Sequence, residues 1–279
     1  MLVSPNLQRP GSAADDRELT HKLRQAAFSD EEAGGGDEFG VVRPRGAPPL
    51  YGWLMREKFR RGTIGLQGAL PGSTALVVCG GPGMDAEFLT RAGARVILSD
   101  VSLGAVLQAE ERSRRFGLDL MLLVADVERL PFRDASVDLV YVHDGLHHLE
   151  EPRQGLAEMA RVAHHAVSVN EPAKSAATNL GIRLGRAEEI EEAGNVVMRL
   201  DLDEVVEGLA VHGFRSIRPH RYAMLYRHWP GRLMRVLSLP GVRTVAVASF
   251  RLANRLFGRY GNKLAVQAVR SAPSTLERP

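Results

Sequence analysis

Cysteine is nearly absent from this 279-residue sequence, and it contains no long uninterrupted apolar run. A single cysteine excludes a disulfide framework and a cysteine-rich zinc site, and it suits a reducing compartment. Residues 1–30 mix acidic and basic side chains without the apolar core of a secretion signal. The most apolar late stretch, residues 233–257, is interrupted by arginines and a proline and is too polar to span a membrane. We therefore expect a cytoplasmic protein without a membrane span, for which peripheral membrane contact stays open.

Acidic residues are missing from the whole interval between Glu207 and Glu277, whereas arginine recurs throughout it. The net charge of +3 therefore hides a strongly basic C-terminal third, whose field would attract an anionic partner. The alternative is that an arginine-rich protein carries its surface charge there without any partner. No motif combines basic and aromatic residues for base stacking, so nucleic acid is not an expected partner.

A glycine-rich turn between a strand and a helix is the most informative motif. The apolar, β-favouring residues 76–78 lead into the turn 79–83 (Cys-Gly-Gly-Pro-Gly), and helical spacing follows from Asp85 to Ala92, where Gly93 ends it. Such a turn lets a ligand approach backbone amides, and the following helix N-terminus favours negative charge. The motif predicts a nucleotide-type cofactor site. Because it also fits the dinucleotide pattern G-x-G-x-x-A, it leaves the cofactor undecided.

Two aspartates at the ends of predicted strands narrow the choice of cofactor. Residues 95–100 predict a second strand ending in Asp100, placed to accept both ribose hydroxyls of a nucleoside. Residues 120–126 predict a third strand ending in Asp126, well placed for an adenine amino group. Residues 130–149 then contain Leu-Pro-Phe, a fourth strand and the run His-Asp-Gly-Leu-His-His-Leu.

Taken together, these features resemble the class I S-adenosylmethionine-dependent methyltransferases, and more narrowly the branch with the quinone C-methyltransferases and many small-molecule methyltransferases. The resemblance covers about residues 75–172. It implies an α/β fold with a Rossmann-like, seven-stranded, mostly parallel sheet whose last strand is antiparallel, with helical N-terminal and C-terminal additions. It also implies S-adenosyl-L-methionine as the cofactor. Cys79 stands where the family usually has the first glycine of G-x-G-x-G. Cys79 as a nucleophile is a rival interpretation, although a cysteine closing an apolar strand is usually a small buried hydrophobe.

The resemblance also implies roles for particular residues. The turn would hold the methionyl end, Asp100 the ribose, and Asp126 with the Val127 amide the adenine. The expected cofactor-binding residues are Cys79, Gly80, Gly81, Gly83, Asp100, Val101, Asp126, Val127, His143 and Asp144.

Catalytic and substrate-binding candidates lie beyond the predicted fourth strand and in the flanking segments. His147, His148 and Asp144 are the catalytic candidates, since histidine has the intrinsic pKa to accept a proton from an activated hydroxyl. The alternative is that this run only shapes the cofactor pocket. The substrate-binding candidates are Tyr51, Glu171, Tyr222 and Asn262, and plain packing is the alternative for Tyr51. No metal site is expected.

The chain is expected to divide into a flexible segment (1–45), a single methyltransferase domain (46–270) and a tail (271–279). Within the domain we expect a cofactor-binding core (73–172), a lid (173–200) and a basic helical insertion (228–262) that is a candidate substrate cap. Pro49 suits the start of a helix, and residues 102–117 predict a helix with Leu103, Val106 and Leu107 facing inward. Alternating strands and helices imply parallel βαβ units, with ligands bound outside the carboxyl ends of the strands.

The functional hypothesis is methyl transfer to a small-molecule acceptor by in-line displacement, and the basic C-terminal third would suit an anionic or carrier-linked acceptor. The alternative is a non-catalytic binding or scaffold protein that keeps the fold and uses its basic surface for anionic partners or a membrane. A nicotinamide-dependent oxidoreductase would leave Asp126 and residues 130–149 without a role. The acceptor, the methylated atom and the oligomeric state stay open.

Overall fold

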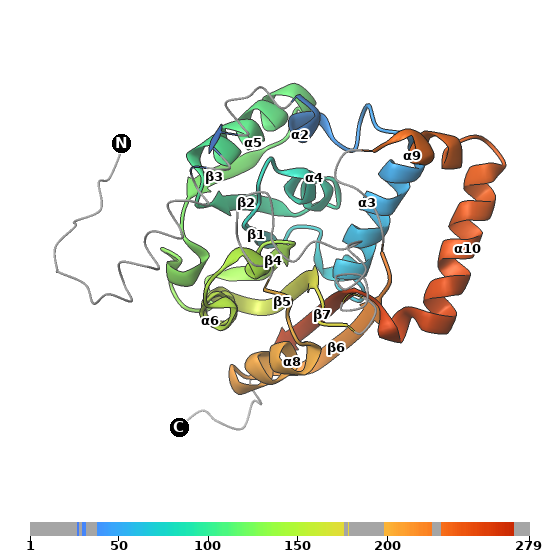
Figure 1. Ribbon diagram of the computed structural model, residues 1–279. Coiled ribbons are helices and arrows are strands. Elements are labelled where there is room, and N and C mark those ends of the chain that lie inside the picture. Colours follow the sequence, from blue (N-terminus) through green and yellow to red (C-terminus); the bar gives the residue numbers. More distant parts are fainter. Residues whose placement is uncertain are drawn as a thin grey trace, which may run out of the picture.

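A seven-stranded sheet in the order β3-β2-β1-β4-β5-β7-β6 runs through the centre of the computed structural model (Figure 1). The structure describes residues 38–175, 198–224 and 230–270, together with residues 27, 30, 31 and 178. Strand β7 pairs antiparallel with both neighbours, β5 and β6, whereas the pairs among β1 to β5 are parallel. The predicted α/β class and the antiparallel end of the sheet are confirmed. The strands are β1 (Thr74–Val78), β2 (Arg95–Asp100), β3 (Leu120–Val124), β4 (Val137–His143), β5 (Ala163–Pro172), β6 (Phe214–Tyr222) and β7 (Lys263–Arg270).

Helices cover both faces of this sheet, with α4 and α5 on one face and α6 and α8 on the other (Figure 1). Helix α3 leads into the sheet, and α9 and α10 lie between β6 and β7 in the chain. The described α-helices are α2 (Glu38–Val42), α3 (Pro49–Gly62), α4 (Met84–Arg91), α5 (Leu103–Phe116), α6 (Pro152–Val162), α8 (Leu202–Val211), α9 (Arg232–Leu237) and α10 (Val242–Phe257). The described 3-10 helices are η1 (Gln67–Ala69), η2 (Val127–Arg129), η3 (Leu146–His148) and η4 (Gly258–Tyr260).

Residues 75–78 of the central strand β1 are all apolar because helices bury both faces of this strand. Successive side chains of a strand point to opposite faces. Ala75 and Val77 therefore join the core under α4 and α5, whereas Leu76 and Val78 join the core under α6 and α8. This double burial explains why β1 reads as a continuous run of apolar residues and carries the glycine turn at a fixed position.

Helix α5 confirms the predicted ends, but of the three residues predicted to face inward only Val106 is buried. The Ser102 side chain accepts a hydrogen bond from the Ala105 amide, and Gly117 takes the left-handed conformation (φ 60°) that ends the helix. Leu103 and Leu107, however, are 55% and 53% exposed. The buried residues of the helix are Ala105, Val106, Ala109 and Arg112. The two leucines lie on the side of the helix away from Ala105 and Ala109.

A third apolar cluster joins α3 to the C-terminal addition. Leu50, Leu54 and Met55 of α3 are buried, and Phe250 of α10 packs against the same cluster. The Trp53 and Phe250 rings meet edge to face, with centroids 5.2 Å apart. Described residues 230–262, within the predicted helical insertion, form α9, α10 and η4, and α10 stands at the periphery of the molecule (Figure 1).

Residues 38–45, within the predicted segment 1–45, form α2 and a connection that is hydrogen-bonded to the domain. Val41 is buried, and the fully buried Arg112 guanidinium donates to the carbonyls of Val41 (2.7 Å) and Arg43. Arg112 also donates to the buried Glu87 carboxylate (3.0 Å), which accepts from Arg45 as well (2.8 Å). Burial of Arg112 and Glu87 thus fastens the start of the domain to α4 and α5.

The remaining predicted segments are described only in part. Residues 176–177 and 179–197 of the predicted lid lie outside the described residues, as do the predicted tail 271–279 and most of residues 1–37. Among the described helices, none has both the length and the hydropathy that crossing a membrane requires. Within the described ranges, no three His, Cys, Asp or Glu side chains are grouped to hold a metal ion.

Candidate active site

The turn after β1 is shaped by packing on one side and by open space on the other. A side chain at Gly80 would collide with Leu98 of β2, since its Cβ would lie 2.6 Å from the Leu98 Cγ. A Cβ at Gly81, in contrast, would meet no atom within 4 Å, and Gly81 and Gly83 adopt φ values of 50° and 83°. The backbone at Gly81 is therefore accessible to a ligand, while Gly80 lets the turn approach the next strand.

Cys79 adopts the left-handed backbone conformation (φ 49°) that glycine takes without strain. Burial raises the pKa of its thiol well above the ordinary value, and the carboxylates of Asp100 and Glu171 raise it further. The thiol thus stays protonated at neutral pH, which argues against the nucleophile interpretation. Cys79 packs against the apolar core beneath β1 as a small hydrophobic residue.

Contact between the turns after β1 and β4 leads to a stability prediction. A Cβ added at Gly145 would lie 2.4 Å from the Cβ of Cys79. We expect Gly145→Ala to lower the free energy of unfolding by about 1–3 kcal/mol, because one of the two turns must move. In a Cys79→Gly background the same change should cost less, since the colliding atom is gone. Urea denaturation measures both, with Gly68→Ala, where an added Cβ meets no atom within 4 Å, as control. If Gly145→Ala lowered the free energy of unfolding equally with Cys79 and with glycine at position 79, the predicted collision with the Cys79 side chain would be contradicted.

Asp100 and Asp126 lie at the carboxyl ends of the neighbouring strands β2 and β3. One Asp100 oxygen accepts from the Gly81 amide (2.9 Å) and the other from the Ser102 amide (3.0 Å). Burial raises the pKa of Asp100, although these amides act in the opposite direction. Asp126 accepts from the Glu128 amide (2.9 Å) and starts η2 at the buried Val127, whereas Val101 is 40% exposed. The structure brings these predicted cofactor residues to one edge of the sheet, and their roles remain predictions.

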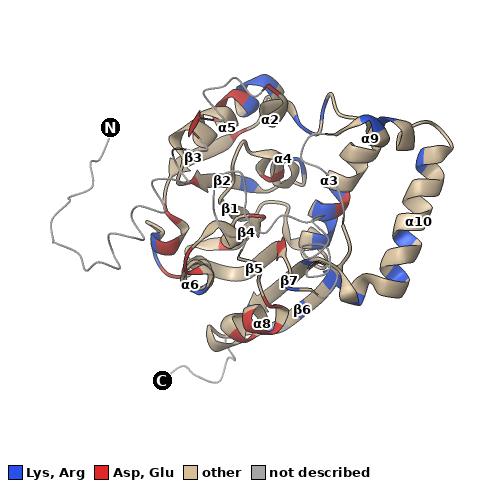
Figure 2. Ribbon diagram, in the orientation of Figure 1, with Lys and Arg blue, Asp and Glu red and all other residues tan. Residues whose placement is uncertain are grey.

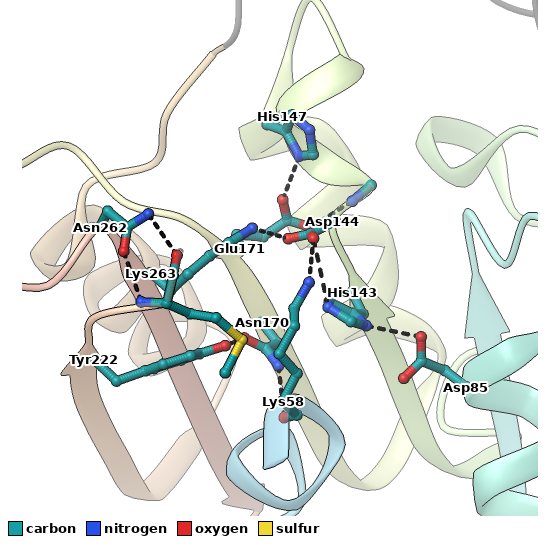
Figure 3. A network of polar contacts seen from close by, with 12 residues as sticks. Lys58, Asp85, His143, Asp144, His147, Asn170, Glu171, Tyr222, Asn262 and Lys263 are labelled. Carbon is teal, nitrogen blue, oxygen red and sulfur yellow. Dashed lines mark hydrogen bonds and ion pairs between the residues drawn. The ribbon is translucent and has the colours of Figure 1, made fainter. Parts of the chain in front are cut away.

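A polar network follows β4 at the same edge (Figure 3). Asp144, which also has a left-handed backbone (φ 51°), receives Lys58 Nζ on one oxygen (2.6 Å) and Lys263 Nζ on the other (2.5 Å). Lys58 comes from α3 and Lys263 from the start of β7, and their side chains are 1% and 11% exposed. Burial raises the pKa of Asp144, but the charges of Lys263 and Lys58 outweigh it and hold that pKa well below its ordinary value. Asp144 is therefore a carboxylate bridging two ammonium groups, which makes it a poor general base.

His147 is held by a fully buried carboxylate. Its Nδ1 lies 2.7 Å from Glu171 Oε2, and the other Glu171 oxygen accepts from the amides of Gly145 (2.8 Å) and Leu146 (2.9 Å). Burial raises the pKa of Glu171, but the hydrogen bond from His147 brings it below the ordinary value. If the carboxylate accepts from Nδ1–H, the lone pair of the neutral ring is on Nε2. The His148 ring lies against that of His147, with centroids 4.0 Å apart.

His143, at the end of β4, lies between Asp85 of α4, the helix that follows the glycine turn, and Asp144. Its Nδ1 lies 2.7 Å from Asp85 in the first turn of α4, and its Nε2 lies 3.5 Å from Asp144. The other Asp85 oxygen accepts from the Tyr141 hydroxyl at 3.2 Å. Burial raises the pKa of Asp85, but His143 brings it below the ordinary value.

The other substrate-binding candidates make contacts within the protein. Tyr51 is fully buried with its ring 5.9 Å from that of Phe39. The buried Tyr222 hydroxyl donates to Asn170 (2.6 Å). Asn262 accepts from the Met224 amide (2.9 Å) and donates to the Met224 carbonyl (3.0 Å). These contacts position α3, β6 and the start of β7 around the network, and the substrate-binding role of each residue remains a prediction.

Lys58, Lys263 and Asp85 were missed by the sequence reasoning. One signal was available for Lys58, because it lies on the face of α3 that is otherwise apolar. A charged residue there is either paired or points into a site. No comparable local signal marks Lys263 or Asp85.

The strand order β3-β2-β1-β4-β5-β7-β6, with helices on both faces, is a Rossmann-like α/β arrangement. Residues 76–166 match the family model described as a methyltransferase domain, which confirms the resemblance over this segment. The chain is similar to a demethylmenaquinone methyltransferase of Renibacterium salmoninarum, with 38% identity over 105 residues that cover 38% of this chain and 43% of that protein. It is also similar to a ubiquinone/menaquinone biosynthesis C-methyltransferase UbiE of Bordetella avium, with 38% identity over 103 residues covering 36% and 40%. The matches thus span less than half of these relatives.

Solved structures extend the likeness in fold to nearly the whole chain. Magnesium protoporphyrin IX methyltransferase (ChlM) from Synechocystis PCC 6803 with bound SAH gives a TM-score of 0.59 at 17% identity, covering 90% of this chain and 100% of that one. The YcgJ protein from Bacillus subtilis gives 0.54 at 15% identity, covering 77% and 99%. At such identities the similarity establishes the fold alone.

Proposed function

We propose that this chain is an S-adenosylmethionine-dependent methyltransferase that acts on a small-molecule acceptor. The observation that carries the proposal is the convergence of three features at one sheet edge within a methyltransferase-domain match: the open backbone at Gly81, the Asp100 carboxylate and the Asp126 carboxylate. The relatives' names support a quinone precursor such as demethylmenaquinone as the first acceptor to test.

The residues at this edge fit the proposed cofactor. A Cβ at Gly81 would meet open space, so a ligand can contact the turn closely. Asp100 lies beside the turn through its bond to the Gly81 amide, and its carboxylate can accept from ribose hydroxyls. Asp126, past the end of the adjacent strand, would accept from the adenine amino group. When bound, S-adenosylmethionine supplies an activated methyl group together with its leaving group.

The protein's own contribution is alignment and charge. Methyl transfer by in-line displacement needs the acceptor atom fixed opposite the leaving group, and such alignment can supply many powers of ten in rate. We propose that Lys58 and Lys263 bind an acceptor oxygen and stabilise its anionic form, because both ammonium groups meet at Asp144 on this edge. This arrangement supports an acceptor with a phenol-type or enol hydroxyl. His147, oriented by Glu171, is the proposed group that accepts the hydroxyl proton.

Calorimetry with S-adenosylhomocysteine tests the cofactor site. We expect Asp100→Asn and Asp126→Asn each to weaken binding about 10- to 100-fold, as expected for loss of hydrogen bonds to a charged group. Asp119→Asn is the matched control, because Asp119 is exposed and precedes β3 at the opposite edge of the sheet. Absence of binding by the unmodified chain, or equal binding by all four proteins, would contradict the proposal. Transfer of labelled methyl from S-adenosylmethionine to quinone precursors such as demethylmenaquinone then tests the acceptor class.

A further inference from the structure

The C-terminal helical addition carries six exposed apolar side chains, three on each of its two helical segments. Leu233, Val236 and Leu239 lie in and just after α9, and Val245, Leu252 and Leu256 lie on α10. Their exposed fractions run from 54% to 71%. We call these six residues the outer stripe. Single exposed apolar residues are ordinary on a protein surface, whereas an aligned set marks an interaction site.

Helix α10 has two apolar faces rather than one. Its inner face, with Ala246, Val247 and Phe250, packs against the cluster that contains α3. Val245, Leu252 and Leu256 are separated by seven and four residues, so they lie on one line of the helix, on the side away from Phe250. Packing of the inner face already attaches α10 to the domain. The outer stripe is therefore not needed for that attachment.

Positive charge accompanies the outer stripe. Every basic residue of α9, α10 and η4 is exposed, and none of these elements contains an acidic residue. Figure 2 shows Lys and Arg on α9 and α10 without Asp or Glu. Arg251 lies over the Trp53 ring, 5.7 Å from its centroid, and Arg259 lies 4.6 Å over the Tyr260 ring. Arg255 lies on α10 next to Leu252 and Leu256, and Arg232 and Arg235 lie on α9 with Leu233 and Val236. Arg243, Arg251 and Arg259 are the other basic residues of these elements.

Exposed apolar residues bordered by positive charge fit one kind of partner, the surface of an anionic phospholipid bilayer. Apolar side chains of an amphipathic helix enter the boundary between headgroups and acyl chains, while arginines pair with lipid phosphates. A second copy of the chain is a poor occupant, because pairing the stripe with itself would bring like charges together. No described helix suits a membrane span, so the contact would be peripheral.

We propose that the outer stripe and its flanking arginines dock this protein onto anionic membrane surfaces. The inference rests on α9 and α10 alone and does not depend on the proposed methyl transfer. Docking would hold the domain through a segment that lies outside the methyltransferase-domain match, which ends at residue 166.

Vesicle sedimentation with the full chain tests docking. One set of vesicles contains phosphatidylglycerol and phosphatidylcholine in equal parts, and the other contains phosphatidylcholine alone. We expect binding to the anionic set to be at least tenfold tighter and to weaken at high salt, since screening reduces the attraction of arginines to the surface. Equal binding to both sets, or none to the anionic set, would overturn the proposal.

A triple variant, V245S/L252S/L256S, separates docking by the stripe from general basicity. We expect at least a tenfold loss of vesicle binding, with unchanged folding because the three side chains are exposed. The matched control is L107S/M121S/V211S, which removes equally exposed apolar residues from other surfaces. Equal binding by the two variants would overturn the role of the stripe. So would a dimer in light scattering that only the stripe variant loses, combined with no vesicle binding, since the occupant would then be a second copy.

Discussion

Replacing Arg112 by methionine is expected to lower the free energy of unfolding by about 3–5 kcal/mol, the range found when one partner of a buried ion pair is removed. Arg112 is fully buried and lies 3.0 Å from Glu87, whose side chain is 1% exposed. The change leaves part of that carboxylate's charge uncompensated and also removes the donor to the Val41 carbonyl. Urea denaturation at neutral pH gives the measurement.

Two further variants make the interpretation specific. Arg112→Met combined with Glu87→Met should recover much of the loss, because no buried charge is then left unpaired. Arg45 and Arg91, which also pair with Glu87, are 40% and 52% exposed and can be solvated. Arg114→Met is the control, since Arg114 is exposed and pairs with Glu111 on the helix surface, where such pairs contribute less than about 1 kcal/mol. If Arg112→Met and Arg114→Met lowered the free energy of unfolding by similar amounts, the stabilising role of the buried Arg112–Glu87 pair would be contradicted.

The ion pairs of Glu87 also predict how its contribution to the free energy of unfolding depends on pH. Burial raises the pKa of Glu87, but hydrogen bonds from Arg45 and Arg91 and the charge of Arg112 lower it to about 2. A carboxyl group whose pKa is lower in the folded than in the unfolded chain stabilises the fold above its unfolded pKa, near 4.5. That contribution is lost as the pH falls toward about 2. The stability difference between wild type and Glu87→Gln should therefore shrink between pH 4.5 and 2.

The elements that could be predicted from the sequence are those with short-range causes. Strand β1 reads as a strand because both of its faces are buried, and the turn at Gly80 and Gly83 follows it directly. Gly117 and Ser102 mark the ends of α5 through their own backbone and side-chain chemistry. Asp100 and Asp126 could be placed at one edge because the carboxyl ends of parallel strands meet there.

The polar network could not be predicted because its contacts join distant parts of the chain. Lys58 and Lys263 are 86 and 119 residues from Asp144. Only the order of strands β4, β5 and β7, and the position of α3 beside them, brings these side chains together. The error at Leu103 and Leu107 has a similar origin, because several faces of α5 carry apolar residues and tertiary packing selected the one with Ala109.

The second large expected effect is a loss of turnover when Lys58 or Lys263, the proposed ligands of the acceptor oxygen, is replaced. We expect Lys58→Met and Lys263→Met each to reduce the turnover number about 100- to 1000-fold, the typical loss when one donor to a developing oxyanion is removed. Binding of S-adenosylhomocysteine should change less than turnover, because Gly81, Asp100 and Asp126 are unaltered and Asp144 keeps one of its two lysine partners. Single-turnover methyl transfer and calorimetry measure the two quantities separately.

A pH profile separates stabilisation of the acceptor anion from a structural role for the lysines. If Lys58 stabilises that anion, its loss makes the acceptor hydroxyl less acidic, so the rising limb of the turnover profile should move to higher pH. Lys174→Met is the control, because Lys174 is half-exposed and lies 3.6 Å from Glu204 on the surface. Suppose instead that Lys58→Met lowers turnover, cofactor binding and the free energy of unfolding together, with the profile unmoved. The lysines would then be structural counter-ions of Asp144, and the acceptor oxygen would have to be bound by other groups at this edge of the sheet.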